Sequence, residues 1–519
     1  MDKQIIKSLS LCVLLSLFVV ELSAAGNNTI REVEGMNYIV LKDSLPFAYQ
    51  VSQPNKIYEI RNSFDLHEAV AVIGENSTLL FNGGILRNGT VEGHKTNIRA
   101  DIRQIFNGDV VIKGDWRVDA AYPEWYGAKG DGITDDRIAI QKTIDAFSKI
   151  VLLNTTYLIG SVNNEKDKIG LELKVGKTLA GIRLYSTTHK KDQTQCVLKV
   201  KEDMDVESVI RINTLCELSH LGIVGNRVNP NSSCVSSNLS SRINLDNISV
   251  ARSRVGFDMC SYLTKIESCI ASYCDTGFSI KGEDVHNTTN ILEKCFAVGC
   301  STTGYYFDKM TYSSIISCAA DGCGVFNESK LGFAYTLNQC SCLTFLSCGC
   351  EQCLKPLYCN MVQNISFLQC NFYINKNNLK LKNDFRLKDA IEIRHSLQVT
   401  IDNSVIDYSQ MNKYIDEKTR LIHLYGVATD NVVLNYIPAA SSSIKKANIG
   451  ISGFLDAQKN IKYTDNTHYL TKGDMAHRPV FKKREEMAGF CYFDTTLGKP
   501  IWWNGRDWVD SNGNNLKSP

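Results

Sequence analysis

The sequence lacks an excess of either charge. It has 57 Lys and Arg residues against 55 Asp and Glu residues, so the formal net charge is +2 over 519 residues. Proteins that hold nucleic acid or anionic membranes by general electrostatics carry a clear basic excess. The composition therefore does not indicate nucleic acid or a charged membrane as a partner, and function must come from local sites.

A second long hydrophobic run is also missing, since the only one lies at the N-terminus. It extends from Leu9 to Val20, which is too short to span a bilayer comfortably. Lys3 and Lys7 precede it and Ser23-Ala24-Ala25 follows, as in a secretory signal with a small-residue cleavage site. We predict that residues 1–25 are cleaved and that the protein is secreted, periplasmic or on a cell surface, with no stable membrane span.

Several catalytic signatures are absent as well. The sequence has no Ser/His/Asp nucleophile signature, no phosphate-binding loop and no dinucleotide fingerprint. The enzyme classes that those motifs define therefore have no support here.

The most informative segment that is present runs from Tyr122 to Asp136 and reads Tyr-Pro-Glu-Trp-Tyr-Gly-Ala-Lys-Gly-Asp-Gly-Ile-Thr-Asp-Asp. Its three glycines predict a tight, irregular loop. We expect a helix next, capped by Thr134 or Asp135, and then a strand over 150–159. Because capping accounts for these carboxylates, we prefer it to a catalytic or metal cluster that includes Asp131.

This order of aromatic residues, Gly-Asp-Gly, Thr-Asp-Asp, helix and strand resembles the opening of the pectate-lyase-superfamily domain, of the rhamnogalacturonase and epimerase type. That group of right-handed parallel β-helix proteins includes cell-wall lyases and hydrolases and phage tailspike depolymerases. The resemblance implies that the helix plugs the first rung of a β-helix. The flanking segments resemble modules of Bacteroides prophage tail and surface proteins, which implies a virion-associated location as an alternative to secretion, and a homotrimer.

The strongest internal signal is a repeated Cys-x-x-x-x-Cys. Its copies are Cys269/Cys274, Cys295/Cys300, Cys318/Cys323 and Cys348/Cys353. Their starts lie 26, 23 and 30 residues apart, and each copy follows a strand-like run. A period of this size is typical of solenoid rungs, which must stack to bury their apolar faces. We therefore predict an all-β fold, a right-handed parallel β-helix.

The cysteines allow three interpretations. Nineteen cysteines in an exported chain suggest disulfides, and losing Cys12 with the signal would leave eighteen. Cysteines at one register would instead stack about 4.8 Å apart as small buried hydrophobes. A metal site is the third option, but the same register recurs elsewhere without such clustering; its ligands would come from Cys340, Cys342, Cys348, Cys350, Cys353 and Cys359. We favour packing, with a few disulfides left open.

The chain divides into five parts. After the signal, residues 26–121 predict a β-rich entry module because short apolar runs alternate with Asn-Gly turns. The pectate-lyase-like β-helix spans 122–440, a linker follows over 441–475, and a small aromatic module ends the chain over 476–519.

The C-terminal module is rich in tryptophan. Asn504-Gly505 between apolar runs predicts a hairpin. Trp502, Trp503 and Trp508 are candidate sugar-binding residues because flat rings suit stacking on sugars. The same three rings could instead form the hydrophobic core of this small module, and we prefer that interpretation.

A candidate catalytic pair emerges from the repeat. The third residue after the first Cys of each copy is Ser272, Val298, Asp321 and Glu351 in turn. If Asp321 and Glu351 lie on adjacent rungs, their backbones stand about 4.8 Å apart, and the carboxyl separation brackets that of glycosidase pairs. Crowding would raise the pKa of one of them, as a general acid requires. Solvated acids are equally normal on such a surface. Other acids without an evident partner are Asp246, Asp258, Asp275, Glu283, Asp284 and Asp308.

The motifs of the enzymatic branches are incomplete. Polygalacturonase-type hydrolases carry Asn-x-Asp, Asp-Asp, Gly-His-Gly and Arg-x-Lys, whereas here only Asn244-Leu-Asp246 and Arg386-Leu-Lys388 match. We identify no acidic cluster of the kind that calcium-dependent lyases use. No cofactor is expected, with Ca²⁺ implied only if the reaction is a lyase reaction.

We therefore expect an exported β-helix protein whose partner is a polysaccharide or glycan. It either cleaves that polymer, as a glycoside hydrolase or polysaccharide lyase, or it is a non-catalytic glycan-binding or structural protein. The fold alone does not decide between them.

Overall fold

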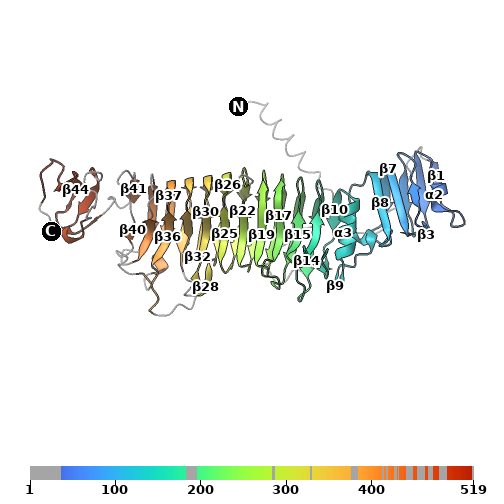
Figure 1. Ribbon diagram of the computed structural model, residues 1–519, viewed down its shortest axis with the longest axis horizontal. Coiled ribbons are helices and arrows are strands. Elements are labelled where there is room, and N and C mark those ends of the chain that lie inside the picture. Colours follow the sequence, from blue (N-terminus) through green and yellow to red (C-terminus); the bar gives the residue numbers. More distant parts are fainter. Residues whose placement is uncertain are drawn as a thin grey trace, which may run out of the picture.

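The computed structural model describes a long rod (Figure 1). The described residues are 37–182, 196–282, 287–327, 330–375, 384–411, 414–415, 419–425, 429, 432–439, 448–452, 462–465, 472–478 and 488–516. The predicted signal over 1–25 lies outside them, as do Glu283 and Asp284. No helix within these ranges is long and apolar enough to cross a membrane.

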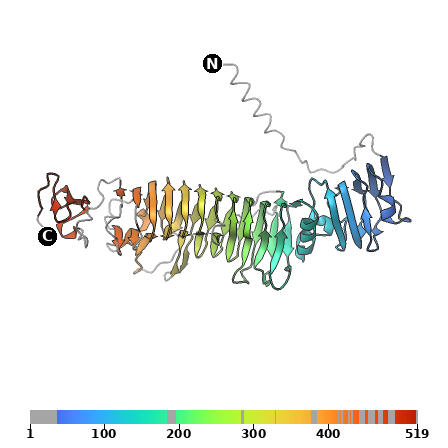
Figure 2. The same ribbon diagram turned by 45° about the horizontal axis from the view of Figure 1, so that its top comes forward.

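The entry module is itself a short stack of parallel strands at one end of the rod (Figures 1 and 2). Its elements are β1 (Asn37–Val40), α2 (Phe47–Gln50), β2 (Lys56–Ile60), β3 (Phe64–Asp65), β4 (Val70–Val72), β5 (Thr78–Phe81), β6 (Leu86–Arg87), β7 (Gly89–Ala100) and β8 (Val110–Trp116). All their ladders are parallel, and they enclose a core separate from that of the main solenoid.

The glycine-rich segment joins the two cores. It forms the 3-10 helix η1 (Pro123–Tyr126), the strand β9 (Asp131–Asp135) and the helix α3 (Arg137–Ala146). On α3, Ile140 and Ile144 are buried in the core of the main solenoid, while Ala139 and Ala146 pack against the core of the entry module. The helix therefore sits between the two stacks, as the resemblance implied.

Of the two predicted caps, Asp135 but not Thr134 binds an amide of the helix. Asp136 occupies the N-cap position of α3 without a side-chain capping bond, and its carboxylate accepts the amides of Lys129 and Gly130 instead. Asp135 accepts the amides of Arg137 and Gly160. Thr134 does not cap the helix, because its hydroxyl donates to the carboxylate of Asp131. The carboxylate of Asp136 thus binds amides of the loop, whereas that of Asp135 binds the first amide of the helix and the amide of Gly160.

The predicted parallel β-helix is confirmed, and each full rung contributes to three faces. Face A is built from β10 (Lys149–Leu152), β13 (Thr178–Gly181), β20 (Lys265–Glu267), β23 (Ile291–Glu293), β26 (Thr311–Ile316), β31 (Ser341–Leu346) and β34 (Gln363–Leu368). Face B is built from β9, β11 (Thr156–Ile159), β14 (Val197–Val200), β21 (Ile270–Ser272), β24 (Phe296–Val298), β27 (Ala319–Asp321), β32 (Gly349–Cys353) and β35 (Asn371–Ile374). Four longer strands bend across both faces: β16 (Glu217–Val224), β18 (Asn244–Ala251), β37 (Leu397–Asp407) and β39 (Val433–Ala439).

Face C closes the solenoid as a second parallel sheet. Its strands are β12 (Ile169–Leu173), β15 (Ser208–Ile212), β17 (Ser233–Ser241), β19 (Val255–Tyr262), β22 (Thr276–Lys281), β25 (Thr303–Asp308), β30 (Phe333–Asn338), β33 (Leu357–Asn360), β36 (Asp389–Arg394), β38 (Arg420–Tyr425) and β40 (Asn448–Ser452). The strand β40 and the strand β41 (Lys462–Asp465) lie in the range predicted as a linker, yet they pair in parallel with β38 and β39. Rung pairing therefore continues past residue 440.

Stacked aromatic rings fill the interior behind face C. The ring centroids of Phe257, Phe278, Tyr305 and Tyr335 follow one another at 4.8, 4.9 and 4.9 Å, with nearly parallel planes. These distances match the spacing of neighbouring strands. The Tyr305 hydroxyl donates to the carbonyl of Ala319, and that of Tyr335 donates to the carbonyl of Gly349. The stack therefore holds the strands β27 and β32 from inside.

The repeated cysteines mark the two corners that flank face B. A residue with positive φ precedes them, for example Ser317 (52°) before Cys318 and Gln352 (53°) before Cys353. The buried thiol then donates to the carbonyl two residues earlier, as Cys318 does to Ile316 at 3.4 Å. Ser404 makes the same bond at the end of this ladder, at 3.0 Å. All the cysteines that the structure describes are free thiols, and all but Cys260, Cys342 and Cys491 are buried.

The remaining described strands form two smaller units. A hairpin of β28 (Val325–Asn327) and β29 (Lys330–Leu331) leaves the corner after β27. The C-terminal module contains β42 (Lys472–Gly473), β43 (Cys491–Asp494), β44 (Lys499–Trp503) and β45 (Trp508–Val509), with β44 and β45 antiparallel around Asn504-Gly505 as predicted.

The tryptophans of this module correct one candidate site. Trp503 and Trp508 are 8% and 4% exposed and pack with Tyr492 and Ile501 in the module's core, so their faces are not available for sugar stacking. Trp502 points to the other side of β44 and is only partly buried, since successive side chains of a strand alternate. Sugar binding by Trp502 stays a prediction.

The thiol ladders give a test of the packing. Burial raises the pKa of Cys274 and of Cys370 to about 12, so these thiols should be unreactive at neutral pH. We expect a thiol reagent to label Cys260 and Cys342 rapidly in the native protein, Cys491 more slowly because burial raises its pKa, and all eighteen cysteines beyond Cys12 only after unfolding in guanidinium. Fewer free thiols in the unfolded protein would show disulfides and contradict the ladder.

Candidate functional site

Asp321 and Glu351 lie side by side on face B. They end the register-matched parts of β27 and β32, where they are direct partners in the parallel ladder. Their backbones are therefore one strand spacing apart, about 4.8 Å. The hairpin of β28 and β29 lies beyond Asp321, so the longer spacing between these two repeats does not shift the register. The sequence-predicted pair is brought together.

A hollow of about 310 Å³ surrounds the pair, and we call it the acid hollow. Its lining residues are Phe296, Ser317, Cys318, Ala319, Ala320, Asp321, Ser347, Cys348, Gly349, Cys350, Glu351, Gln369 and Asn371. Phe296, Ala319, Gly349 and Asn371 form one register column beside the acids. The small residues Ala319 and Gly349 form the middle of this column, with the ring of Phe296 at one end and the side-chain amide of Asn371 at the other. A Cβ on Gly349 would meet the carbonyl oxygen of Asn371 at 2.5 Å.

Asp321 is set apart by its environment. Burial, followed by the nearby charge of Glu351, raises the pKa of Asp321 above its ordinary value. Its Oδ1 atom is buried and has no hydrogen-bond partner among the residues that the structure describes. A carboxyl that resists ionisation beside a second carboxyl is the arrangement of a general acid with its partner.

Other stacked acids on the solenoid have compensating cations. Asp246, Glu267 and Glu293 also follow one another in register, on face A. Lys294 lies 3.2 Å from Glu267 and 2.8 Å from Glu293, and Lys265 lies 2.5 Å from Glu267. These cations remove the cost of stacking like charges. Asp321 and Glu351 form no ion pair with any residue in the described part of the chain.

The weaker acidic candidates are tied to neighbours. Asp258 pairs with Lys281 at 2.9 Å, and Asp275 pairs with Arg254 at 2.9 Å. Asp308 accepts a hydrogen bond from the amide of Asn338 at 2.7 Å. These contacts give each acid a structural role.

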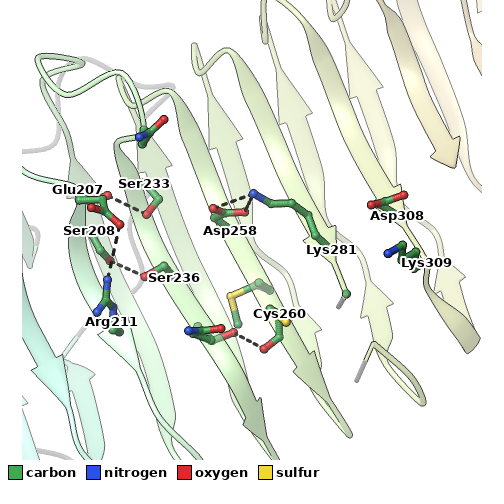
Figure 3. A pocket seen from close by; sticks show the side chains of 15 residues that line it. Glu207, Ser208, Arg211, Ser233, Ser236, Asp258, Cys260, Lys281, Asp308 and Lys309 are labelled. Carbon is green, nitrogen blue, oxygen red and sulfur yellow. Dashed lines mark hydrogen bonds and ion pairs between the residues drawn. The ribbon is translucent and has the colours of Figure 1, made fainter. Parts of the chain in front are cut away.

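A second hollow on face C had no signal in the sequence motifs (Figure 3). It measures about 490 Å³, and we call it the serine hollow. Its lining is almost wholly polar: Glu207, Ser208, Arg211, Asn231, Ser233, Ser236, Ser237, Asn238, Asp258, Met259, Cys260, Lys281, Gly282, Asp308 and Lys309. The ion pair of Asp258 and Lys281 crosses its floor. Only the strand register could have revealed it, because its residues come from five strands of unrelated sequence.

The described residues do not assemble a metal site. Within the described ranges, no three His, Cys, Asp or Glu side chains are grouped so that they could hold a metal ion. Cys350 and Cys353 lie on the same strand, β32, and their thiols interact, but no third ligand joins them within the described ranges.

No protein-family model matches the chain, and no curated protein matches it either. Among solved structures, the A-module of the mannuronan C-5 epimerase AlgE4 of Azotobacter vinelandii is 15% identical, with a TM-score of 0.48 over 67% of this chain and 100% of that one. The gp42 tailspike of an Acinetobacter phage is 14% identical, with a TM-score of 0.48 over 76% and 78%. The catalytic domain of a GH87 α-1,3-glucanase is 10% identical, with a TM-score of 0.43 over 67% and 68%.

The environment of Asp321 predicts an unusual effect on stability. Its raised pKa means that the folded state holds the proton more tightly than the unfolded state, so stability is lost as the pH rises through the folded pKa. We expect Asp321→Asn to raise the melting temperature at pH 7 and to lose this advantage below the ordinary pKa of an aspartate.

Glu267→Gln is the matched control on face A. Hydrogen bonds from Lys265 and Lys294 lower the pKa of Glu267, so this substitution should lower the melting temperature at pH 7. Thermal unfolding followed by circular dichroism across pH would decide. A destabilised Asp321→Asn protein at pH 7 would show that the Asp321 carboxylate has a stabilising partner.

Proposed function

We propose that this protein binds a polysaccharide on face B and hydrolyses it with Asp321 and Glu351. The observation that carries the proposal is their direct pairing in register, with one oxygen of Asp321 buried and without a hydrogen-bond partner among the described residues. Natural surfaces avoid like charges at directly opposed positions because they are destabilising. An unfavourable arrangement of charges of this kind is characteristic of catalytic residues.

The spacing supports a retaining mechanism. Side chains in register on adjacent strands start from backbones about 4.8 Å apart, so the two carboxyl groups can adopt the roughly 5 to 5.5 Å separation of retaining glycosidases. Asp321, whose pKa is raised, is the general acid. Glu351, which is exposed to the hollow, is the nucleophile.

In the first step, protonated Asp321 gives its proton to the glycosidic oxygen while a carboxylate oxygen of Glu351 forms a bond to the anomeric carbon. The glycosidic bond breaks and the leaving sugar departs with the proton. In the second step, the Asp321 carboxylate takes a proton from water, the water oxygen bonds to the anomeric carbon, and the ester to Glu351 breaks. Both carboxyl groups return to their starting states.

A non-catalytic glycan-binding role is the second candidate. The serine hollow favours it, because hydroxyl, amide and charged groups converge there. Asp258 in this hollow pairs with Lys281, so its acids do not form a pair that lacks a compensating cation. In either role the N-terminal signal pattern supports action outside the cytoplasm, at a cell surface or on a virion.

Activity on a polysaccharide panel tests the proposal. We expect the purified protein to release reducing ends from at least one polymer, without the absorbance of unsaturated products, and with retention of anomeric configuration by NMR. General acid catalysis contributes about 10² to 10⁴ in rate, so Asp321→Asn should lower kcat by that factor, and Glu351→Gln should abolish turnover.

Glu293→Gln is the control, because Glu293 is an outward acid on face A that pairs with Lys294. Its activity should equal that of the wild type. Full activity in Asp321→Asn, or unsaturated products, would refute hydrolysis by this pair. Retention of glycans without any product would favour the binding role.

A further inference from the structure

We infer that Phe296 and Tyr273 form a sugar-stacking subsite for a neutral glycan, one rung to the N-terminal side of the acid pair. The inference rests on the proposed function of that pair. It also fixes the direction of the bound polymer, which follows the long axis of the rod across successive rungs of face B.

Phe296 supplies the first ring. It is partly exposed at the start of β24 and lines the acid hollow. Its register partner on the next rung is Ala319, followed by Gly349. Because both of these side chains are minimal, nothing in this column stands between the ring of Phe296 and the space beside Asp321 and Glu351.

Tyr273 supplies the second ring from the corner after β21. It is 60% exposed, and its column continues through Gly299 and Gly322, since the amide of each corner residue bonds to the carbonyl of the next rung. The Tyr273 ring lies next to Gly299, where a Cβ would meet two ring carbons at 3.0 Å. A Cβ on Gly322 would meet nothing within 4 Å. The ring thus reaches along the axis toward open space beside Asp321.

The two rings bracket Val298, which is the register partner of Asp321 on the preceding rung. Aromatic faces beside a partly exposed valine form an apolar platform, and the carboxyls follow it directly. A sugar ring has apolar faces formed by its C–H groups, and such a face stacks on aromatic rings. The neighbouring acids would repel a uronate carboxylate, so the geometry favours a neutral sugar.

Tyr312 offers a matched control. Like Tyr273 it is a strongly exposed tyrosine, at 70%, and it has a similar left-handed backbone, with φ of 46° against 53°. It lies on face A, away from the acid hollow. Asn tolerates this backbone well, so Tyr273→Asn and Tyr312→Asn both remove a ring without adding strain.

Affinity electrophoresis is the test, with neutral gels of galactomannan, xyloglucan or mixed-linkage β-glucan and anionic gels of alginate or polygalacturonate. Each ring variant is also made in the Asp321→Asn background, so that cleavage does not consume the ligand. We expect retention by a neutral polymer, weakened about tenfold in Kd by Tyr273→Asn and by Phe296→Leu, and unchanged by Tyr312→Asn. Melting temperatures check that each variant is folded.

The outcomes separate this inference from the proposed hydrolysis. Cleavage with retention that is indifferent to Tyr273 and Phe296 would overturn the subsite and leave the acid pair standing. Ring-dependent retention without cleavage by the wild type would overturn hydrolysis and leave the subsite standing. Stronger retention by the anionic gels would overturn the neutral ligand class, and no retention on any gel would overturn both proposals.

Discussion

Each side chain in this solenoid has a neighbour at the same position on the next rung, about 4.8 Å away. This constraint of lateral stacking governs the interior first. Flat rings satisfy it behind face C, where Phe257, Phe278, Tyr305 and Tyr335 stack at the spacing of the strands. Small thiols satisfy it at the corners, where each donates to a backbone carbonyl that the bend leaves accessible. The same interior rings bond to the backbone of β27 and β32, so the packing that stabilises the rod also fixes the acid pair.

On the outer surface the same constraint makes stacked like charges unfavourable. Elsewhere the solenoid resolves this conflict by interleaving lysines, as around Glu267, or by amides, as in the bonds from Asn360 to Asn338 and from Asn338 to Asp308. Asp321 and Glu351 stack without either device among the described residues. The acid pair is thus an exception to a rule that the rest of the described solenoid obeys, which is the reason for assigning it a function rather than a structural role.

Much of this architecture could be predicted, because stacked rungs repeat the same residue types at regular intervals along the sequence. The Cys-x-x-x-x-Cys copies sit at the two corners of face B, so counting from the first Cys placed Asp321 and Glu351 in one column. Capping was predicted wrongly for Thr134, since the loop amides compete for the same carboxylates. Tyr273 was missed because its ring is placed by glycines one and two rungs later, a relation that no local motif records. The parallel pairing of the entry module was missed for a similar reason, because its Asn-Gly turns are equally typical of hairpins.

In the proposed arrangement a glycan lies along the axis of face B with its scissile bond at Asp321 and Glu351. A crystal structure of the Asp321→Asn protein with a bound oligosaccharide of the retained polymer tests this most directly. We expect one sugar ring against Phe296 and Tyr273, and the next glycosidic oxygen within hydrogen-bond distance of the residue at position 321. An oligosaccharide bound in the serine hollow of face C, with the acid hollow empty, would contradict it.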